Sequence, residues 1–301
     1  MKKIYKEEKG TVTLLVAFMM VIFIGLSAVV IDGGNLYLKK STLQKAVDAA
    51  VLAAAQELPT DRDQAMVEVR TVFEKNKVQP LNVNISFYNH YTMIKISAVE
   101  RVKLFYGGFF GYENVEVNAN ASVQLQTLAS AKGTVPLGVE KALNLQFGEK
   151  TYLKVGDSTV GNFGALALTG PGAKNYEEDL KDGYDFELLI GEKLATQTGN
   201  IVGPTQRAIN HRINSCSINN ATYDHYPSDC PRVVTVPVFE SVRTDQNQIK
   251  EVKVVGFASF FIEGFTENEN DVVGRFIENT ISGAMDPTAK NYGTYSFKIV
   301  E

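Results

Sequence analysis

Few side chains that could carry out chemistry occur close together in this sequence. The three histidines, His90, His211 and His225, lie far apart, and Cys216 and Cys230 lack the C-x-x-C spacing of a zinc site. There is no G-x-S-x-G nucleophile elbow and no G-x-x-x-x-G-K-[ST] phosphate loop. We therefore expect no enzyme activity, no cofactor and no bound metal. A hydrolase whose nucleophile and base meet only in the fold remains an alternative.

Two groups of polar residues keep metal binding open as an alternative. His225 and Asp229 lie between the two cysteines, and Glu177, Glu178 and Asp179 are consecutive carboxylates of the kind that bind calcium. The simpler interpretation is a loop closed by a disulfide in the first case and a solvated acidic surface in the second.

The overall composition is that of a globular chain of about two domains. Of the 301 residues, 45% are apolar and 21% are charged, which excludes wholesale disorder. The net charge of −4 argues against a dedicated nucleic-acid-binding protein, because such proteins carry a basic excess. Apolar residues are, however, concentrated in one segment near the N-terminus.

Residues 11–31 contain no charged side chain, and their length predicts a transmembrane helix. Twenty-one helical residues extend roughly 31 Å, close to the thickness of a bilayer core. A cleaved signal peptide is the alternative, although its apolar region is usually 7–15 residues long. Because this run is longer, we predict an uncleaved single-pass anchor preceded by a cytoplasmic stub at residues 1–10.

Lysines and cysteines together predict on which side the large C-terminal part lies. Four lysines precede the span and three follow it closely, so the positive-inside rule favours a cytoplasmic N-terminus only slightly. A bond between Cys216 and Cys230 would close a polar loop of 15 residues, worth about 3 kcal/mol. Disulfides persist outside the cytoplasm, so we predict an extracytoplasmic C-terminal part. Two buried free thiols are the alternative.

A second helical pattern follows the apolar span. Apolar residues recur at steps of three and four up to Pro59, which ends the helix. We predict that this stripe packs laterally against other subunits or against copies of itself, because small side chains let helices approach closely. A core helix packed on the following domain is the alternative. The predicted interface residues are Leu43, Val47, Ala50, Ala54 and Leu58.

The remaining sequence predicts an α+β fold. A helix at 61–75, capped by Thr60, is followed by alternating patterns at 81–87, 94–98 and 115–125, which predict antiparallel strands. We therefore expect an α+β module at residues 32–130. Residues 131–301 are rich in glycine and turns and predict a mainly β domain, with a short helix at 204–213 and paired core strands at 232–242 and 251–265.

The N-terminal motifs resemble those of TadE/TadG-like Flp pilus-assembly proteins of bacteria. Lys9-Gly10 precedes the span, Asp32-Gly33-Gly34-Asn35-Leu36-Tyr37 follows it, and the alanine-rich run 43–55 comes next. Prepilin-like members carry Glu where this chain has Leu15, so the uncleaved TadG-like branch is the better match. The D-x-S-x-S metal motif of some TadG-like chains is not matched at residues 157–159.

The resemblance implies a non-catalytic, membrane-anchored component of a Tad/Flp-type pilus or a related secretion apparatus in the bacterial cell membrane. The implied partners are membrane lipid and other pilus-assembly or pilin-like subunits, with possible self-association. A membrane-tethered ligand-binding protein or adhesin is the alternative function.

Overall fold

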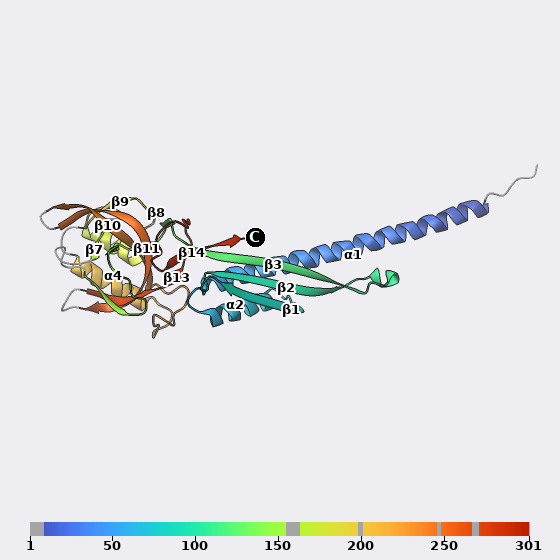
Figure 1. The fold of residues 1–301 in the computed structure, drawn as a ribbon, viewed down its shortest axis with the longest axis horizontal. Coiled ribbons are helices and arrows are strands. Elements are labelled where there is room, and N and C mark those ends of the chain that lie inside the picture. Colours follow the sequence, from blue (N-terminus) through green and yellow to red (C-terminus); the bar gives the residue numbers. More distant parts are fainter. Residues whose placement is uncertain (1–8, 155–162, 198–200, 246–247, 267–270, 301) are drawn as a thin grey trace, which may run out of the picture.

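The computed structural model describes residues 9–154, 163–197, 201–245, 248–266 and 271–300. Most of the predicted stub, and the segment at residues 157–159, lie outside these ranges. The molecule is elongated, with half of helix α1 (Lys9–Gln56) projecting at one end and a β-rich domain at the other (Figure 1). The predicted α+β class is confirmed.

α1 is one unbroken helix of 48 residues, equivalent to a length of about 72 Å. The sequence predicted two helices with a change at Asp32-Gly33-Gly34, but the structure continues the helix through these residues. A Cβ added at Gly33 or Gly34 would meet no atom within 4 Å, so neither glycine is required for close packing. A glycine lowers the stability of a helix by only about 1 kcal/mol relative to alanine. The many helical turns on both sides of Gly33 and Gly34 offset this loss.

The next helix, α2 (Arg62–Lys75), packs against the C-terminal part of α1. Its N-cap is Asp61, whose carboxylate accepts a hydrogen bond from the backbone N–H of Gln64 at 2.8 Å. The predicted cap at Thr60 is therefore wrong by one residue. The Thr60 hydroxyl instead donates to the carbonyl of Glu278 in the C-terminal part of the chain.

A five-stranded sheet follows, in the order β1-β2-β3-β14-β13. Neighbouring strands are antiparallel except β13 and β14, which are parallel. The strand bounds are β1 (Asn82–Tyr88), β2 (Met93–Lys103), β3 (Asn114–Thr127), β13 (Asn279–Thr280) and β14 (Thr294–Val300). The three strands predicted between residues 81 and 125 are thus confirmed, and β2 and β3 are longer than their alternating cores.

The last strand of the chain belongs to the first sheet. β14 pairs with β3 from Tyr295 opposite Thr127 to Val300 opposite Ser122. Tyr295 is buried in the same core as α1 and β3. The sheet that begins within residues 32–130 is therefore completed by the C-terminus, which the sequence did not predict.

A larger sheet forms the distal domain, in the order β6-β12-β11-β10-β5-β7, with β9 also pairing with β11. β4 and β8 form a separate two-stranded ladder. The antiparallel pair predicted at 232–242 and 251–265 is confirmed as β10 and β11. The bounds are β4 (Ser130–Ala131), β5 (Leu137–Glu140), β6 (Lys150–Lys154), β7 (Phe163–Ala165), β8 (Leu188–Leu189), β9 (Lys193–Ala195), β10 (Val233–Asp245), β11 (Gln248–Thr266) and β12 (Asp271–Ile277).

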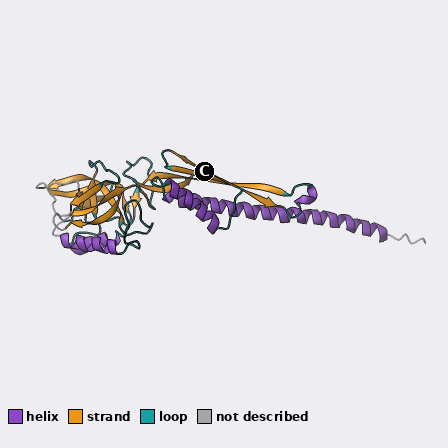
Figure 2. Cartoon of the chain, turned by 90° about the horizontal axis from the view of Figure 1, so that it is seen from below, coloured by secondary structure: helices purple, strands orange, loops and turns teal. Residues whose placement is uncertain are grey.

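Two helices, α3 (Ala173–Asp182) and α4 (Val202–Asn214), pack together on one side of this domain (Figure 2). α4 confirms the helix predicted at 204–213, and its Ala208 and Ile209 are fully buried. α3 was not predicted, because its charged residues suggested only a solvated surface. Its buried face consists of Tyr176, Asp179 and Leu180.

Candidate functional site: the apolar helix and the hairpin beside it

Among the described residues, the histidine and cysteine side chains are dispersed or already bonded. His90 lies in the turn between β1 and β2, His211 lies on α4, and His225 lies between the bonded cysteines. Within the described ranges, no group of three or more His, Cys, Asp or Glu side chains is placed to hold a metal ion.

The acidic run on α3 is held by neighbouring groups. Arg207 on α4 forms an ion pair with Glu177, and this hydrogen-bonded partner lowers the pKa of the Glu177 carboxyl. Asp179 accepts hydrogen bonds from the backbone N–H of Thr169 at 3.0 Å and from its hydroxyl at 2.6 Å. These contacts fix α3 to its surroundings, so the run has a structural role.

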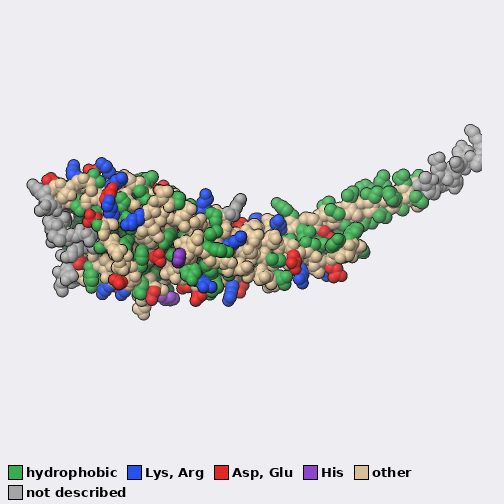
Figure 3. Space-filling view, viewed as in Figure 1, with side chains coloured by type: hydrophobic (Ala, Val, Ile, Leu, Met, Phe, Trp, Pro, Cys, Tyr) green, Lys and Arg blue, Asp and Glu red, His purple; other side chains and the backbone are tan. Residues whose placement is uncertain are grey.

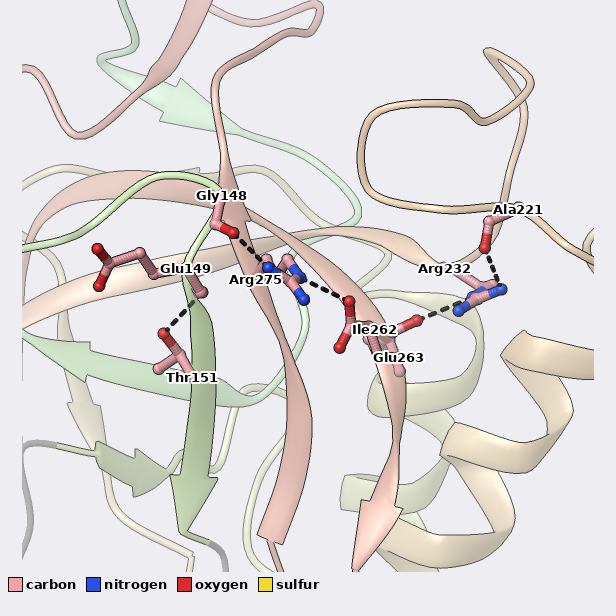
Figure 4. A network of polar contacts seen from close by, with 8 residues as sticks. All are labelled: Gly148, Glu149, Thr151, Ala221, Arg232, Ile262, Glu263 and Arg275. Atoms are coloured by element: carbon pink, nitrogen blue, oxygen red, sulfur yellow. Dashed lines mark hydrogen bonds and ion pairs between the residues drawn. The ribbon is translucent and has the colours of Figure 1, made fainter.

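Cys216 and Cys230 form the predicted disulfide. Its loop is fixed to the β-sheet by Arg232, which donates to the carbonyls of Ile262 and Ala221, each at 2.8 Å (Figure 4). The Arg232 guanidinium also lies 4.5 Å from the ring centre of Phe261, and burial lowers its pKa. Because the Arg232 cation is buried among carbonyl oxygens and an aromatic ring, we assign it a role in holding the fold together.

Arg275 makes a parallel set of contacts nearby on β12. Its guanidinium donates to Glu263 at 2.7 Å and to the carbonyl of Gly148, and the hydrogen bond with Glu263 raises the arginine's pKa (Figure 4). The Arg275 guanidinium also lies 4.6 Å from the ring of Tyr223, in the disulfide loop. Together the two arginines attach this loop to the sheet.

The N-terminal half of α1 is the most unusual surface of the molecule. The large apolar side chains from Val12 to Ile31 are 44% to 74% exposed, and this is the single helix of the described chain that is long and apolar enough to cross a membrane. Figure 3 shows that green, hydrophobic side chains predominate on the projecting arm of the molecule. Removing one such side chain from water is worth roughly 1.5–3 kcal/mol, so this surface requires an apolar environment.

The C-terminal half of α1 has the opposite character. The five predicted interface residues, Leu43, Val47, Ala50, Ala54 and Leu58, are each at most 1% exposed and belong to the core formed with α2 and the first sheet. This burial within the chain corresponds to the alternative stated above, in which the stripe belongs to a core helix packed on the following domain. These side chains leave no surface for a second subunit, which would have to contact another face of α1.

Asp32 connects the two halves of α1 to the hairpin formed by β2 and β3. Its carboxylate accepts hydrogen bonds from the backbone N–H groups of Phe105 at 2.7 Å, Tyr106 at 3.0 Å and Gly107 at 2.8 Å. The side chain is 8% exposed, and the three donors satisfy the carboxylate that burial would otherwise destabilise. Periodicity could not reveal this contact, because it joins residues more than seventy positions apart.

Two further contacts continue along the same side of the helix. Asn35 donates from its side-chain amide to the carbonyl of Lys103 at 3.3 Å, and Lys39 forms an ion pair with Glu100 at 3.3 Å. Residues 32, 35 and 39 share one face of a helix, since they are separated by three and four positions. With the shared core at residues 43–55, these contacts show that the hairpin lies along α1 from Asp32 onward.

Comparison with known proteins supplies one match, over the helix just described. A search of curated proteins and a search of solved structures found no match. The family model for putative Flp pilus-assembly TadE/G-like proteins matches residues 10–57, which are all of α1 except Lys9, together with the residue that follows it. In this segment, with its apolar half, Asp32 and its buried half, the chain is similar to TadE/G-like Flp pilus-assembly proteins.

Proposed function

We propose that this chain is a membrane-anchored, non-catalytic component of a Tad/Flp-type pilus or related secretion apparatus. The apolar half of α1 spans the bacterial cell membrane once, and the sheet-containing parts lie outside the cytoplasm. The observation that carries the proposal is the continuity of α1, whose exposed apolar half and buried half form one helix within the matched segment.

Continuity favours an anchor over a cleaved signal sequence. The segment Leu26-Ser27-Ala28 contains the small residues at which a signal peptide could be cleaved. Cleavage there would cut inside the helix, where Ala28 is buried, with only 5% of its surface exposed. Four residues later on the same face, Asp32 binds the hairpin. The disulfide supports an extracytoplasmic location, because such bonds persist in oxidising compartments.

Partner subunits, in this proposal, contact α1 through its outward face. Phe23, Val30 and Tyr37 lie on this face at seven-residue steps and are 64%, 72% and 74% exposed, and Leu38 beside them is 66% exposed. The exchanged segment therefore carries part of this face, whereas the predicted stripe is packed inside the chain. Lateral packing of helices in a membrane depends on close van der Waals contact, so it is sensitive to side-chain shape on this face.

An anchor exchange tests the proposal. Residues 12–27 would be replaced by an unrelated apolar helix of equal length, leaving Ala28 and Asp32 in place. We expect normal membrane integration but loss of co-purification with the pilus-assembly subunits of the source bacterium. A photo-crosslinking residue at Leu38 should capture those subunits, and one at the buried Val47 should not.

The alternative function, a tethered ligand-binding protein or adhesin, predicts a different result. There the anchor would only hold the outer domain at the membrane, so the exchange would leave function intact. Full co-purification after the exchange, with no crosslink at Leu38, would contradict lateral packing. Intact mass of the membrane-extracted chain, with and without reductant and alkylation, tests both the uncleaved N-terminus and the disulfide.

A further inference from the structure

An uncharged aromatic surface occurs at the end of the β2–β3 hairpin. Residues 104–112, here called the hairpin tip, read Leu-Phe-Tyr-Gly-Gly-Phe-Phe-Gly-Tyr and contain no charged side chain. Phe105, Phe109, Phe110 and Tyr112 are 70%, 86%, 66% and 67% exposed. Four large aromatic side chains exposed within eight residues form an apolar patch of the kind that marks an interaction surface.

The hairpin tip is held in one orientation by its own packing and by Asp32. Gly107, in the short helix η1 (Gly107–Phe110), has no room for a side chain, since an added Cβ would lie 2.3 Å from Leu104 Cδ1 and 2.4 Å from the Tyr112 carbonyl oxygen. The Gly107 N–H is one of the three that Asp32 binds. The aromatic side chains are therefore presented by an ordered backbone.

The tip lies level with the end of the apolar segment of α1. Asp32 follows Ile31 directly, so the backbone it binds is at the depth where the uncharged run ends. Figures 1 and 2 both show η1 beside α1 at the extremity of the hairpin that points toward the helix N-terminus. A span at residues 11–31 would bring these aromatic side chains to the boundary between acyl chains and headgroups.

We propose that the hairpin tip inserts into the outer leaflet of the membrane that α1 crosses, as a second attachment beside the span. The inference rests on the proposed membrane anchor. Phenylalanine and tyrosine suit this boundary, because their rings enter the acyl region while a tyrosine hydroxyl stays at the headgroups. Lys103 and Glu113, both exposed, flank the tip on its polar side and limit its depth to the interface. The occupant of this surface is lipid, because the patch is attached to α1 at Asp32, where the uncharged span ends.

The absence of tryptophan from the sequence allows a direct test with single reporters. Phe110→Trp places a tryptophan in the tip, Phe23→Trp places one in the span and Phe186→Trp places one in the distal domain. The three native side chains are matched in exposure at 66%, 64% and 68%. Each full-length variant is reconstituted into two kinds of phosphatidylcholine vesicle, one with lipid brominated near the headgroup end of the acyl chain and one with lipid brominated near the chain terminus. The measured quantities are quenching by the shallow-brominated lipid, quenching by the deep-brominated lipid and quenching by acrylamide from water.

We expect the shallow-brominated lipid to quench Phe110→Trp about twofold or more and the deep-brominated lipid to quench Phe23→Trp, while neither lipid quenches Phe186→Trp. If Phe23→Trp is quenched and Phe110→Trp behaves like Phe186→Trp, the anchor stands and the tip proposal is overturned. Protection of Phe110→Trp from acrylamide without quenching by lipid also overturns it, since the tip would then be covered by protein. If neither brominated lipid quenches Phe23→Trp, the anchor itself fails, and the tip proposal fails with it.

Discussion

At residue level, Asp32 does more than mark the end of the apolar segment. Its carboxylate binds three consecutive backbone N–H groups of the hairpin tip, and one of these donors, on Gly107, is buried. Charged acceptors form the stronger hydrogen bonds in proteins, and a buried donor left without a partner is costly. The side chain therefore determines how the hairpin is placed on α1.

Replacing Asp32 should release the hairpin tip while leaving the rest of the sheet intact. We expect Asp32→Ala to cost roughly 1–3 kcal/mol of local stability, and Asp32→Asn less, because one acceptor oxygen remains. Hydrogen exchange should then speed up at the amides of Phe105, Tyr106 and Gly107. Glu113→Ala, at the base of the same loop, is the control. Unchanged exchange in Asp32→Ala would mean that the three bonds contribute nothing.

Glu57, at the C-terminal end of α1, should make stability depend on pH. Its pKa is raised, first by burial and then by the nearby carboxylates Glu68 and Asp61. The folded state therefore favours the protonated form, so this contribution to stability is present at low pH and is lost as the pH rises above 4.5.

We expect Glu57→Gln to be more stable than the wild type at pH 7, by roughly 0.5 kcal/mol or less because water screens a half-exposed group. The two proteins should converge as the pH falls toward 4.5. Urea unfolding across this range provides the measurement. Glu68→Gln, which removes one of the neighbouring charges, should reduce the difference. A wild type that gains stability over Glu57→Gln as the pH rises would contradict the assigned direction.

Among the secondary-structure elements, α1 combines an exposed apolar surface in its N-terminal half with a buried apolar stripe in its C-terminal half. Its N-terminal half is apolar on all sides, whereas from Leu43 onward its large apolar side chains face α2 and the sheet. Hydrophobic periodicity predicted both patterns correctly. It did not predict what covers the second stripe, because the same spacing suits a core and an interface between helices.

Substitutions in that stripe should test the fold of this chain. Ala50 is fully buried, so Ala50→Leu adds volume to a filled core and should cost about 1–3 kcal/mol. Ala49→Leu, on a half-buried neighbouring position, should cost much less. Urea unfolding of both variants gives the comparison. Equal stability of the two, with loss of subunit co-purification only in Ala50→Leu, would instead support the predicted interface.

Across the whole molecule, the N- and C-terminal parts of the chain share one sheet. Besides the pairing of β14 with β3, the Thr280 hydroxyl donates to the carbonyl of Leu58 at 2.7 Å. Tyr295 is buried in the same core as α1 and β3, and this burial raises its pKa to about 12. The contacts between the two parts are thus extensive near the end of α1.

Removing β14 should destabilise the sheet that carries the hairpin. Deletion of residues 294–301 removes the buried Tyr295 and exposes the edge of β3, and loss of a buried aromatic side chain alone costs about 3–5 kcal/mol. We expect exchange protection to be lost at Ser122 to Thr127 of β3. Lys298→Ala, an exposed position on the same strand, is the control. Retained protection in the deletion variant would show that the first sheet is stable alone.

The sequence allowed local features to be predicted better than distant ones. The apolar segment, the alternating strands of the first sheet and the β10–β11 pair each depend on neighbouring residues. The return of β14 joins residues about 170 positions apart, and the Asp32 contacts join a helix to a loop tip. Such pairings depend on how whole elements pack, and a single sequence contains no periodic signal for them.

The unbroken course of α1 has a mechanical consequence for a chain embedded as proposed. A helix without a linker transmits tilt, rotation and axial pull from the bilayer to the sheet that it helps to form, because no flexible segment absorbs the motion. The contacts of Asp32, Asn35 and Lys39 with the β2–β3 hairpin stiffen α1 at the point where, in this proposal, the helix leaves the lipid. Force applied to the distal domain during assembly would accordingly reach the membrane segment as a directed load.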